Sequence, residues 1–122
     1  MKQYIDGFVL PMPKKNLKAY QKMAQEGGNL WMKHGALQYI ECVGEDLKSA
    51  EKWGCLPFPK MVKTKADEIV VFSFIIFKSR KHRDSVNAKV MKEINSAKWQ
   101  NKPMPFEMKR MAVGGFETIV NL

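Results

Sequence analysis

The stretch that decides the fold is Ile-Val-Val-Phe-Ser-Phe-Ile-Ile-Phe, at residues 69–77. Its β-branched and aromatic residues predict a strand. Side chains alternate between the two faces of a strand, and here both faces are apolar. One face carries Val71, Ser73, Ile75 and Phe77, and the other carries Val70, Phe72, Phe74 and Ile76. A sheet with helices on one face leaves the other face in need of a cover.

The second apolar face has two candidate covers. The first is the sheet of another copy of the chain, which would pack face to face about a two-fold axis and form a closed dimeric barrel. The second is the segment of residues 44–64, which has no sustained hydrophobic period and would fold under the sheet. The dimer is the simpler explanation, and both covers are compatible with the pattern.

The rest of the chain predicts an α+β fold. Strand patterns occupy residues 4–10, 36–43 and 108–120, and Pro11 and Pro13 are expected to close the first of them. Helical periods run from Lys14 to a stop at Gly35, and again after an N-cap at Ser79. This order is the ferredoxin-like βαββαβ pattern, an antiparallel sheet with two helices on one face. We expect residues 1–122 to form one domain. Within the segment of residues 44–64, a helical turn is expected near residues 47–52.

Composition excludes several classes of protein. The chain has 122 residues, of which 45% are hydrophobic, and 21 Lys and Arg against 12 Asp and Glu give a net charge of +9. These totals describe a basic globular domain and exclude a multidomain enzyme, a fibrous protein and a coiled coil. Two Cys and two His are too few for a disulfide scaffold or an ordinary zinc site, so no metal or cofactor is expected.

The sequence also predicts a compartment. Asp6 and Pro11 interrupt any apolar signal segment, and the longest apolar run has nine residues. A spanning helix needs about 20 residues, so no membrane partner is expected. The sequence therefore predicts a cytoplasmic protein, in which Cys42 and Cys55 are expected to be reduced thiols.

A candidate pocket follows if the aromatic face of the central strand looks into the barrel. Alternation places Asp6 and Phe8 together, whereas the smaller residues at positions 5, 7 and 9 suit close packing against helices. It likewise places Tyr39 and Glu41 together. The candidate pocket residues are Asp6, Phe8, Tyr39, Glu41, Phe72, Phe74, Lys109 and Arg110. A carboxylate in an apolar cavity needs a partner. The set therefore predicts either a binding pocket with acid/base capacity, or a buried ion pair or a rim residue at the dimer interface.

The densest basic cluster, at residues 78–83, is a candidate anion site. It lies where a helix is expected to begin, so free backbone N–H groups and cations would converge there. The residues concerned are Ser79, Arg80, His82 and Arg83. The alternative is an ordinary solvated helix start. Positive charge is spread over both halves of the chain, +4 in residues 1–63 and +5 in residues 64–122, so nucleic acid is not the expected partner.

Several stretches resemble the bacterial YbaA-like family, a domain of unknown function in the dimeric α+β barrel superfamily. They are residues 6–9, 35–37 with 41–42, 70–74, 79–80 with 82–84, 87–91, and 104–106 through 109–111 to 114–117. The resemblance implies a ferredoxin-like protomer and a homodimer, but no activity and no catalytic residues. The wider superfamily includes cofactor-independent oxygenases, haem-degrading enzymes and proteins that only bind, so membership leaves the function open.

These observations lead to three hypotheses of function. The first is a cytoplasmic homodimer that binds a small, partly apolar molecule, expected to be anionic, between sheet and helices, oriented by Asp6, Glu41, Lys109 and Arg110. The second is a cofactor-independent oxygenase or isomerase that uses Asp6 or Glu41 as general base. The third is nucleic-acid binding through the basic surface, with a steep dependence on salt. Whether the protein is an enzyme is left open by the sequence.

Overall fold

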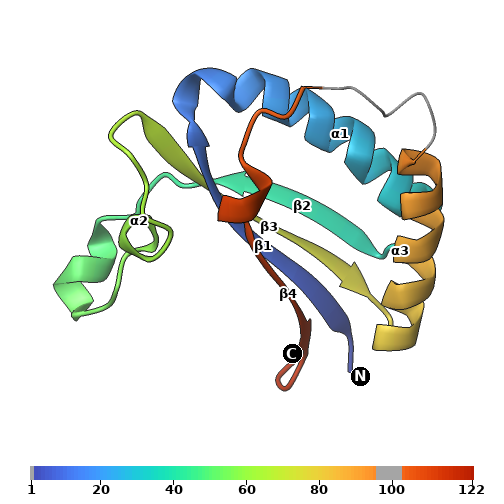
Figure 1. The fold of residues 1–122 in the computed structure, drawn as a ribbon. Coiled ribbons are helices and arrows are strands. Elements are labelled where there is room, and N and C mark those ends of the chain that lie inside the picture. The colour runs from blue at the N-terminus through green and yellow to red at the C-terminus, as the bar shows by residue number, and fades with distance from the viewer. Residues whose placement is uncertain (1, 96–102) are drawn as a thin grey trace.

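The computed structural model describes residues 2–95 and 103–122, which form an α+β fold around one antiparallel sheet (Figure 1). The four strands are β1 (Tyr4–Pro13), β2 (Gln38–Val43), β3 (Glu68–Phe77) and β4 (Ala112–Glu117). They lie in the order β2-β3-β1-β4, and each neighbouring pair is antiparallel. The α+β class and the antiparallel sheet predicted from the sequence are confirmed.

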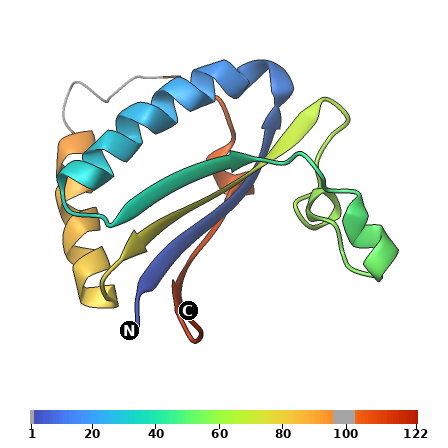
Figure 2. The same cartoon turned by 180° about the vertical axis from the view of Figure 1, so that it is seen from behind.

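The two long helices pack on one face of this sheet, which we call the inner face. They are α1 (Leu17–Lys33) and α3 (Arg80–Ile94). Figures 1 and 2 show α1 running across the sheet, with α3 standing beside one end of it. Short helical segments are η1 (Lys14–Asn16), η2 (Ser49–Trp53), α2 (Phe58–Met61) and η3 (Met108–Arg110). No helix of the described residues is long and apolar enough to cross a membrane.

The inner face supplies two clusters of buried side chains. Near the start of α1, Tyr20 and Ala24 pack against Leu10, Met12 and Val71 of the two central strands. The second cluster lies near α3 and contains Leu30, Ala36, Ile75, Phe77, Val86 and Val90. Burial of such side chains is the main stabilising contribution to the fold.

The first strand continues through the two prolines that were expected to end it. Lys14 N–H donates to the carbonyl of Asp67 at 2.9 Å, so even-numbered residues of β1 direct their N–H groups toward β3. The backbone nitrogens of Pro11 and Pro13 therefore point toward the β4 edge of β1. Pairing with β4 reaches only from Tyr4 to Val9, so the missing proline N–H groups interrupt no ladder there.

The ends of the two long helices agree with the sequence. The Ser79 hydroxyl accepts a hydrogen bond from His82 N–H at 3.1 Å, which confirms the predicted N-cap of α3. Gly35 follows α1 with a φ of +111°, a conformation that favours glycine, and it ends that helix as predicted. The last strand is shorter than expected, because η3 occupies the start of the predicted segment. The helical period that follows Ser79 in the sequence extends to Ala97, and Trp99 begins an irregular connector; these two residues lie outside the described ranges.

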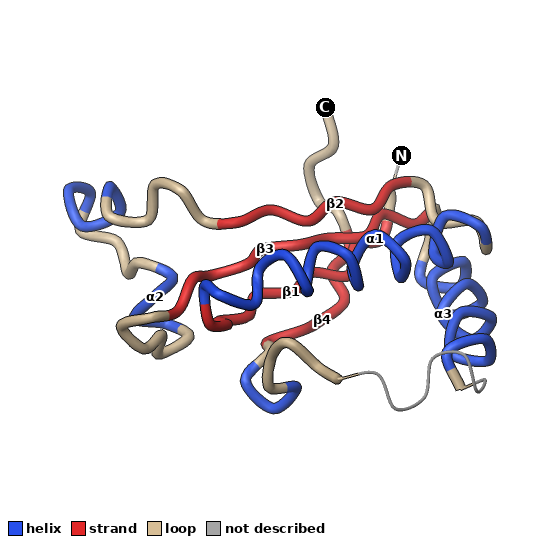
Figure 3. The backbone as a smooth tube through the Cα atoms, turned by 90° about the horizontal axis from the view of Figure 1, so that it is seen from above, coloured by secondary structure: helices blue, strands red, loops and turns tan. Residues whose placement is uncertain are grey.

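The connector between β2 and β3 extends beyond the end of the sheet and does not fold under it (Figure 3). It contains η2, near the predicted helical turn, and α2. Its contact with the sheet includes Phe58 against Phe72, with ring centroids 6.4 Å apart. Phe72 remains 44% exposed and Phe116 of β4 remains 61% exposed. The second of the two predicted covers therefore reaches only one end of the outer face.

Candidate functional site

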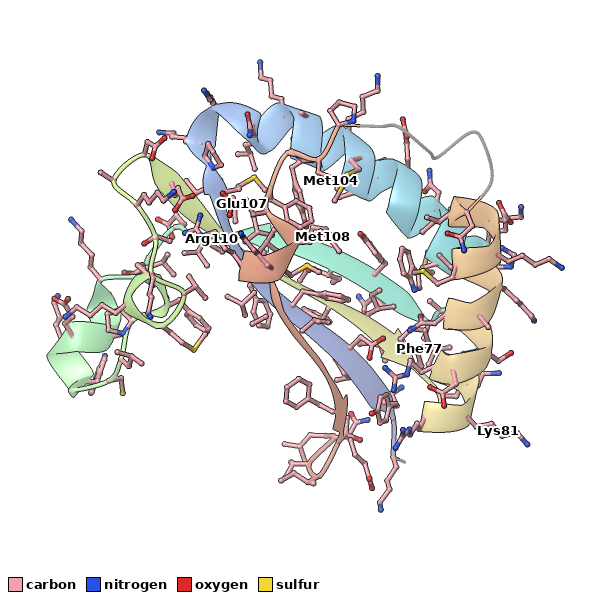
Figure 4. The ribbon with its side chains drawn as sticks, viewed as in Figure 1. Phe77, Lys81, Met104, Glu107, Met108 and Arg110 are labelled. Atoms are coloured by element: carbon pink, nitrogen blue, oxygen red, sulfur yellow. The ribbon has the colours of Figure 1, made fainter. Side chains whose placement is uncertain are left out.

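A cavity of about 630 Å³ lies between the inner face of the sheet and the helices. Its walls come from β1, β2, β3, β4, α1, α3 and the segment of residues 103–111 that leads into β4. Figure 4 shows Met104 and Met108 on this segment, near the space between α1 and the sheet. Ligand pockets typically have volumes of about 300–1,000 Å³, so the cavity is large enough for a small organic molecule.

Most of the cavity wall is apolar and adaptable. Aromatic side chains contribute Phe8, Trp31 and Phe106. Of the nine methionines in the chain, five line the cavity: Met23, Met91, Met104, Met108 and Met111. Methionine is unbranched and polarizable, and its side chain adapts to differently shaped partners. This wall therefore suits an apolar molecule without fixing its outline.

One polar cluster in the cavity is centred on Glu41 of β2. The Tyr20 hydroxyl donates to Glu41 Oε1 at 2.6 Å, and the Tyr39 hydroxyl donates to Oε2 at 2.7 Å. Tyr39 and Glu41 share the inner face because they are two residues apart in a strand, and Tyr20 reaches them from α1. Burial raises the pKa of both phenols well above the usual value, and the nearby Glu41 carboxylate raises it further. Both tyrosines therefore stay protonated and act as donors.

The Glu41 cluster separates two spaces. A second hollow of about 350 Å³ opens between α1 and β2, and it shares Tyr20, Tyr39 and Glu41 with the main cavity. The two phenols and the carboxylate thus bridge α1 and β2 at the boundary between these spaces. Glu41 is therefore accessible from the second hollow as well as from the main cavity.

The other polar cluster is centred on Asp6, whose exposed fraction is only 5%. Arg83 Nη1 donates to Asp6 Oδ1 at 2.8 Å, and Asn87 Nδ2 donates to Oδ2 at 3.3 Å. Trp31 Nε1 donates to Asn87 Oδ1 at 2.9 Å, which extends the network to α1. The Arg83 guanidinium also lies 4.8 Å from the centre of the Tyr4 ring. Asp6 is therefore fully engaged by its neighbours, as buried charges require.

The charges around the cavity are opposite in sign to those of the whole chain. Among the described residues that line the cavity, the Asp, Glu, Lys, Arg and His residues are Asp6, Glu41 and Arg83. Their formal charges sum to −1 − 1 + 1 = −1, against +9 for the chain. Arg83 is already paired with Asp6. The surplus negative charge therefore belongs to Glu41.

The structure brings together four of the eight candidate pocket residues. Asp6, Phe8, Tyr39 and Glu41 all line the cavity. They share the inner face because Asp6 pairs with Ile75 and Glu41 pairs with Ser73, and directly opposed residues project to the same side. The prediction that residues 5, 7 and 9 would pack against the helices is wrong for the same reason, since they lie on the outer face.

The other four candidates lie elsewhere. Phe72 and Phe74 are on the outer face, with ring centroids 5.9 Å apart, because they alternate with the inner-face residues of β3. Lys109 and Arg110 belong to the η3 turn and not to a strand, so they are not set on a sheet face. Lys109 is exposed. The expectation that these two cations orient a ligand beside Asp6 and Glu41 is therefore corrected.

Arg110 instead forms a bidentate ion pair with Glu68 at the start of β3. Arg110 Nη1 donates to Glu68 Oε2 at 2.6 Å, and Nη2 donates to Oε1 at 2.8 Å. The hydrogen bonds from Arg110 lower the pKa of Glu68 to about 2, and a further hydrogen bond from Lys65 N–H acts in the same direction. The pair fastens the η3 turn to the sheet and lies outside the cavity.

The candidate anion site at the start of α3 is already occupied by internal contacts. Ser79 caps the helix, and His82 Nδ1 accepts a hydrogen bond from Lys78 N–H at 2.9 Å. Arg83 turns inward to Asp6, and Arg80 Nε lies 3.9 Å from Asp84 Oδ2. The four predicted residues thus do not converge on one anion. Lys81 points away from the sheet (Figure 4).

Potential metal ligands and free thiols are two further features of the described residues. Across residues 2–95 and 103–122, no group of three His, Cys, Asp or Glu side chains is placed to hold a metal ion. Cys42 and Cys55 are free and exposed. Neither observation adds a polar group to the two clusters of the cavity.

Sequence reasoning missed several residues of the cavity. Tyr20 and Trp31 belong to the apolar stripe of α1, so they look like ordinary core residues. Arg83 and Asn87 are four residues apart on α3 and therefore share a helix face, a spacing that indicates cooperation with one partner. The identity of that partner, Asp6, depends on how α3 docks, which the local sequence does not specify.

Comparisons with known proteins show which family resembles this chain. The family described as "Protein of unknown function (DUF1428)" matches residues 3–108. "Uncharacterized protein YbaA" from Escherichia coli strain K12 is 36% identical over 119 residues, which cover 98% of each chain. The protein of the same description from Shigella flexneri gives the same figures. Among solved structures, "De novo designed protein Foldit4" aligns over 99% of this chain and 100% of its own, at 10% identity and a TM-score of 0.43.

Proposed function

The chain belongs to the DUF1428 family of proteins of unknown function, and on that premise we propose that it is a binding protein for a small, mostly apolar molecule. The molecule would lie between the sheet and the helices. The observation that carries the proposal is the cavity of about 630 Å³, whose apolar wall surrounds two polar clusters. A large apolar pocket with a few convergent polar groups is the usual form of a ligand site.

Binding is better supported than base catalysis. A general base needs a free lone pair directed at the proton that it removes. Asp6 accepts hydrogen bonds from Arg83 and Asn87, and both oxygens of Glu41 accept hydrogen bonds from phenols. Asp6 is thus held in an ion pair, and the lone-pair positions that remain on Glu41 lie beside two fixed phenol donors, an arrangement that suits recognition and positioning of a ligand.

The proposal is tested with methyl-labelled methionine and a neutral apolar probe, octanol. Five cavity methionines should report the probe through changes in their methyl NMR signals. Met32 on α1 and Met61 on α2 are exposed and outside the cavity, so their signals serve as internal controls. Saturable changes confined to the cavity methionines support the proposal. Unchanged cavity signals, or changes equally large at Met61, would refute it.

We further propose that the protein is a single-domain cytoplasmic homodimer with the ferredoxin-like arrangement, paired through the outer faces of its sheets. The strand order β2-β3-β1-β4 and the two helices on one face support the arrangement. The exposed Phe72 and Phe116 support the pairing, because soluble monomers rarely leave large contiguous apolar patches open. The two free, exposed cysteines fit a reducing compartment.

A further inference from the structure

We infer that the molecule held in the cavity is an amphiphilic cation, an amine or ammonium group on an apolar body, with its charge at Glu41. This inference rests on the proposed function, since it names the class of ligand for the same cavity. It replaces the anionic ligand that the sequence alone suggested. Three independent features of the wall support it: charge, aromatic rings and apolar lining.

The first feature is the uncompensated charge of Glu41. Among the described residues, no Lys, Arg or His forms an ion pair with Glu41, whereas Asp6 has Arg83 at 2.8 Å. A carboxylate has about four lone-pair positions, and the two phenols occupy two of them. The phenols supply dipoles but no positive charge. A partly buried carboxylate in this state favours a cationic partner, because pairing offsets the cost of its desolvation.

The second feature is the pair of tyrosines that contact this carboxylate, each of which packs against another aromatic ring. Tyr20 pairs with Phe106, with ring centroids 5.7 Å apart, and Tyr39 pairs with Trp31 at 6.1 Å. All four rings line the cavity. Rings of this kind attract a cation placed over their faces. A cation at Glu41 would therefore lie beside the Tyr20 ring from α1 and the Tyr39 ring from β2.

The third feature is the rest of the wall, which holds only apolar or already paired groups. The five methionines adapt to an alkyl chain or a ring. The Asp6–Arg83 pair at the other polar cluster is neutral overall and satisfied by Asn87. An anionic head group would find no unpaired cation among the described lining residues, and Glu41 would repel it.

The inference is tested with three probes that share an eight-carbon chain: octylamine, octanol and nonanoate. At neutral pH they carry an ammonium, a hydroxyl and a carboxylate, and the labelled methionines measure the affinity of each. A charged hydrogen bond with cation–π contacts corresponds to roughly tenfold in affinity, so octylamine should bind about tenfold more tightly than octanol. Nonanoate should bind most weakly, although the net charge of +9 would attract it to the surface.

Two variants isolate Glu41. Glu41→Gln keeps an acceptor for the tyrosines but removes the charge, so octylamine and octanol should then bind within about twofold of each other. Glu45→Gln removes the same charge from an exposed residue outside the cavity and should keep the tenfold preference. Octanol binding by each variant shows that its cavity is intact.

The outcomes separate the two proposals. If all three probes bind equally, or nonanoate binds best, the cationic ligand is wrong and the cavity remains a binding site. If the amine preference survives Glu41→Gln, the charge is recognised elsewhere and the inference also fails. If no probe changes the cavity methionine signals, the proposed function fails and the inference fails with it.

Discussion

The ion pair between Asp6 and Arg83 joins β1 to α3 through side chains alone. Arg83 Nη1 lies 2.8 Å from Asp6 Oδ1, and the two side chains are 19% and 7% exposed. Removing one partner of a buried pair leaves an uncompensated charge, whereas removing both costs much less. Loss of one partner alone should therefore destabilise the protein more than loss of both.

Arg83→Met should lower the free energy of unfolding by about 3 kcal/mol, because it leaves the Asp6 carboxylate buried without its cation. Adding Asp6→Asn to this variant should restore part of the loss. Urea denaturation measures both effects. Arg80→Met, at an exposed position on the same helix, should change the stability by less than about 0.5 kcal/mol. Equal losses for Arg83→Met and Arg80→Met would contradict the role given to the pair.

The Glu68–Arg110 pair should make stability depend on pH in the acid range. The folded-state pKa of Glu68 is lowered from 4.5 to about 2, so the pair contributes fully above pH 4.5 and its contribution is lost as the pH falls toward 2. Denaturation of the wild type and of Glu68→Gln across this range measures the difference. The advantage of the wild type should shrink as the pH falls. A difference that stays constant would show that the pair does not titrate with folding.

At the scale of elements, two adjacent glycines of α1 differ in what they face. A Cβ at Gly27 would lie 3.8 Å from the Trp31 ring, an ordinary contact, whereas a Cβ at Gly28 would lie 2.7 Å from the Tyr39 ring. Tyr39 is held in place by its hydrogen bond to Glu41. Gly28 therefore permits the close approach of α1 to β2 that builds the Glu41 cluster.

Gly27→Ala should stabilise the protein by up to about 1 kcal/mol, because alanine restricts the unfolded chain and favours the helix. Gly28→Ala should destabilise it by about 1–3 kcal/mol, because the new methyl group displaces the Tyr39 ring. Thermal and urea unfolding measure both variants, which differ only in position along one helix. If both substitutions stabilise the protein alike, α1 and β2 are not in close contact at Gly28.

Most of the elements could be predicted from the sequence, because local signals determine them. Runs of β-branched and aromatic residues predict the strands, and the cap at Ser79 and the stop at Gly35 are chemical features of single residues. The extent of β1 was underestimated, since whether Pro11 interrupts a sheet depends on the length of β4, which is a distant segment. The prediction that residues 5, 7 and 9 of β1 face the helices is also wrong. The size of a side chain does not determine which face of a sheet it occupies, whereas the register of the strand does.

At the scale of the whole molecule, the outer face of the sheet carries the exposed side chains of Phe72 and Phe116, and we expect this face to form the dimer. Phe72→Asp should give a monomer in light scattering, because a charge would be buried between the two sheets. Phe72 is 44% exposed in the single chain, so the variant should still fold. Met32→Asp, on the exposed side of α1, is the matched control and should remain a dimer. A wild-type monomer would overturn the pairing.

The candidate site was only half predictable. Asp6 and Glu41 stood out as carboxylates in apolar strands, and the structure places both at one cavity. Their partners come from helices that pack across the sheet, Arg83 from α3 and Tyr20 from α1, and such long-range contacts leave no local signature. Lys109 was placed wrongly because a helical turn replaces the start of the predicted strand.

The central claim is that the helices and the sheet leave between them a cavity that admits small apolar molecules. A crystal structure determined under xenon pressure tests it without knowledge of the natural ligand, since xenon occupies apolar cavities. We predict a bound xenon atom among the methionines between α1, α3 and the inner face. A structure in which the chain's own side chains fill this space, with no xenon there, would contradict the account.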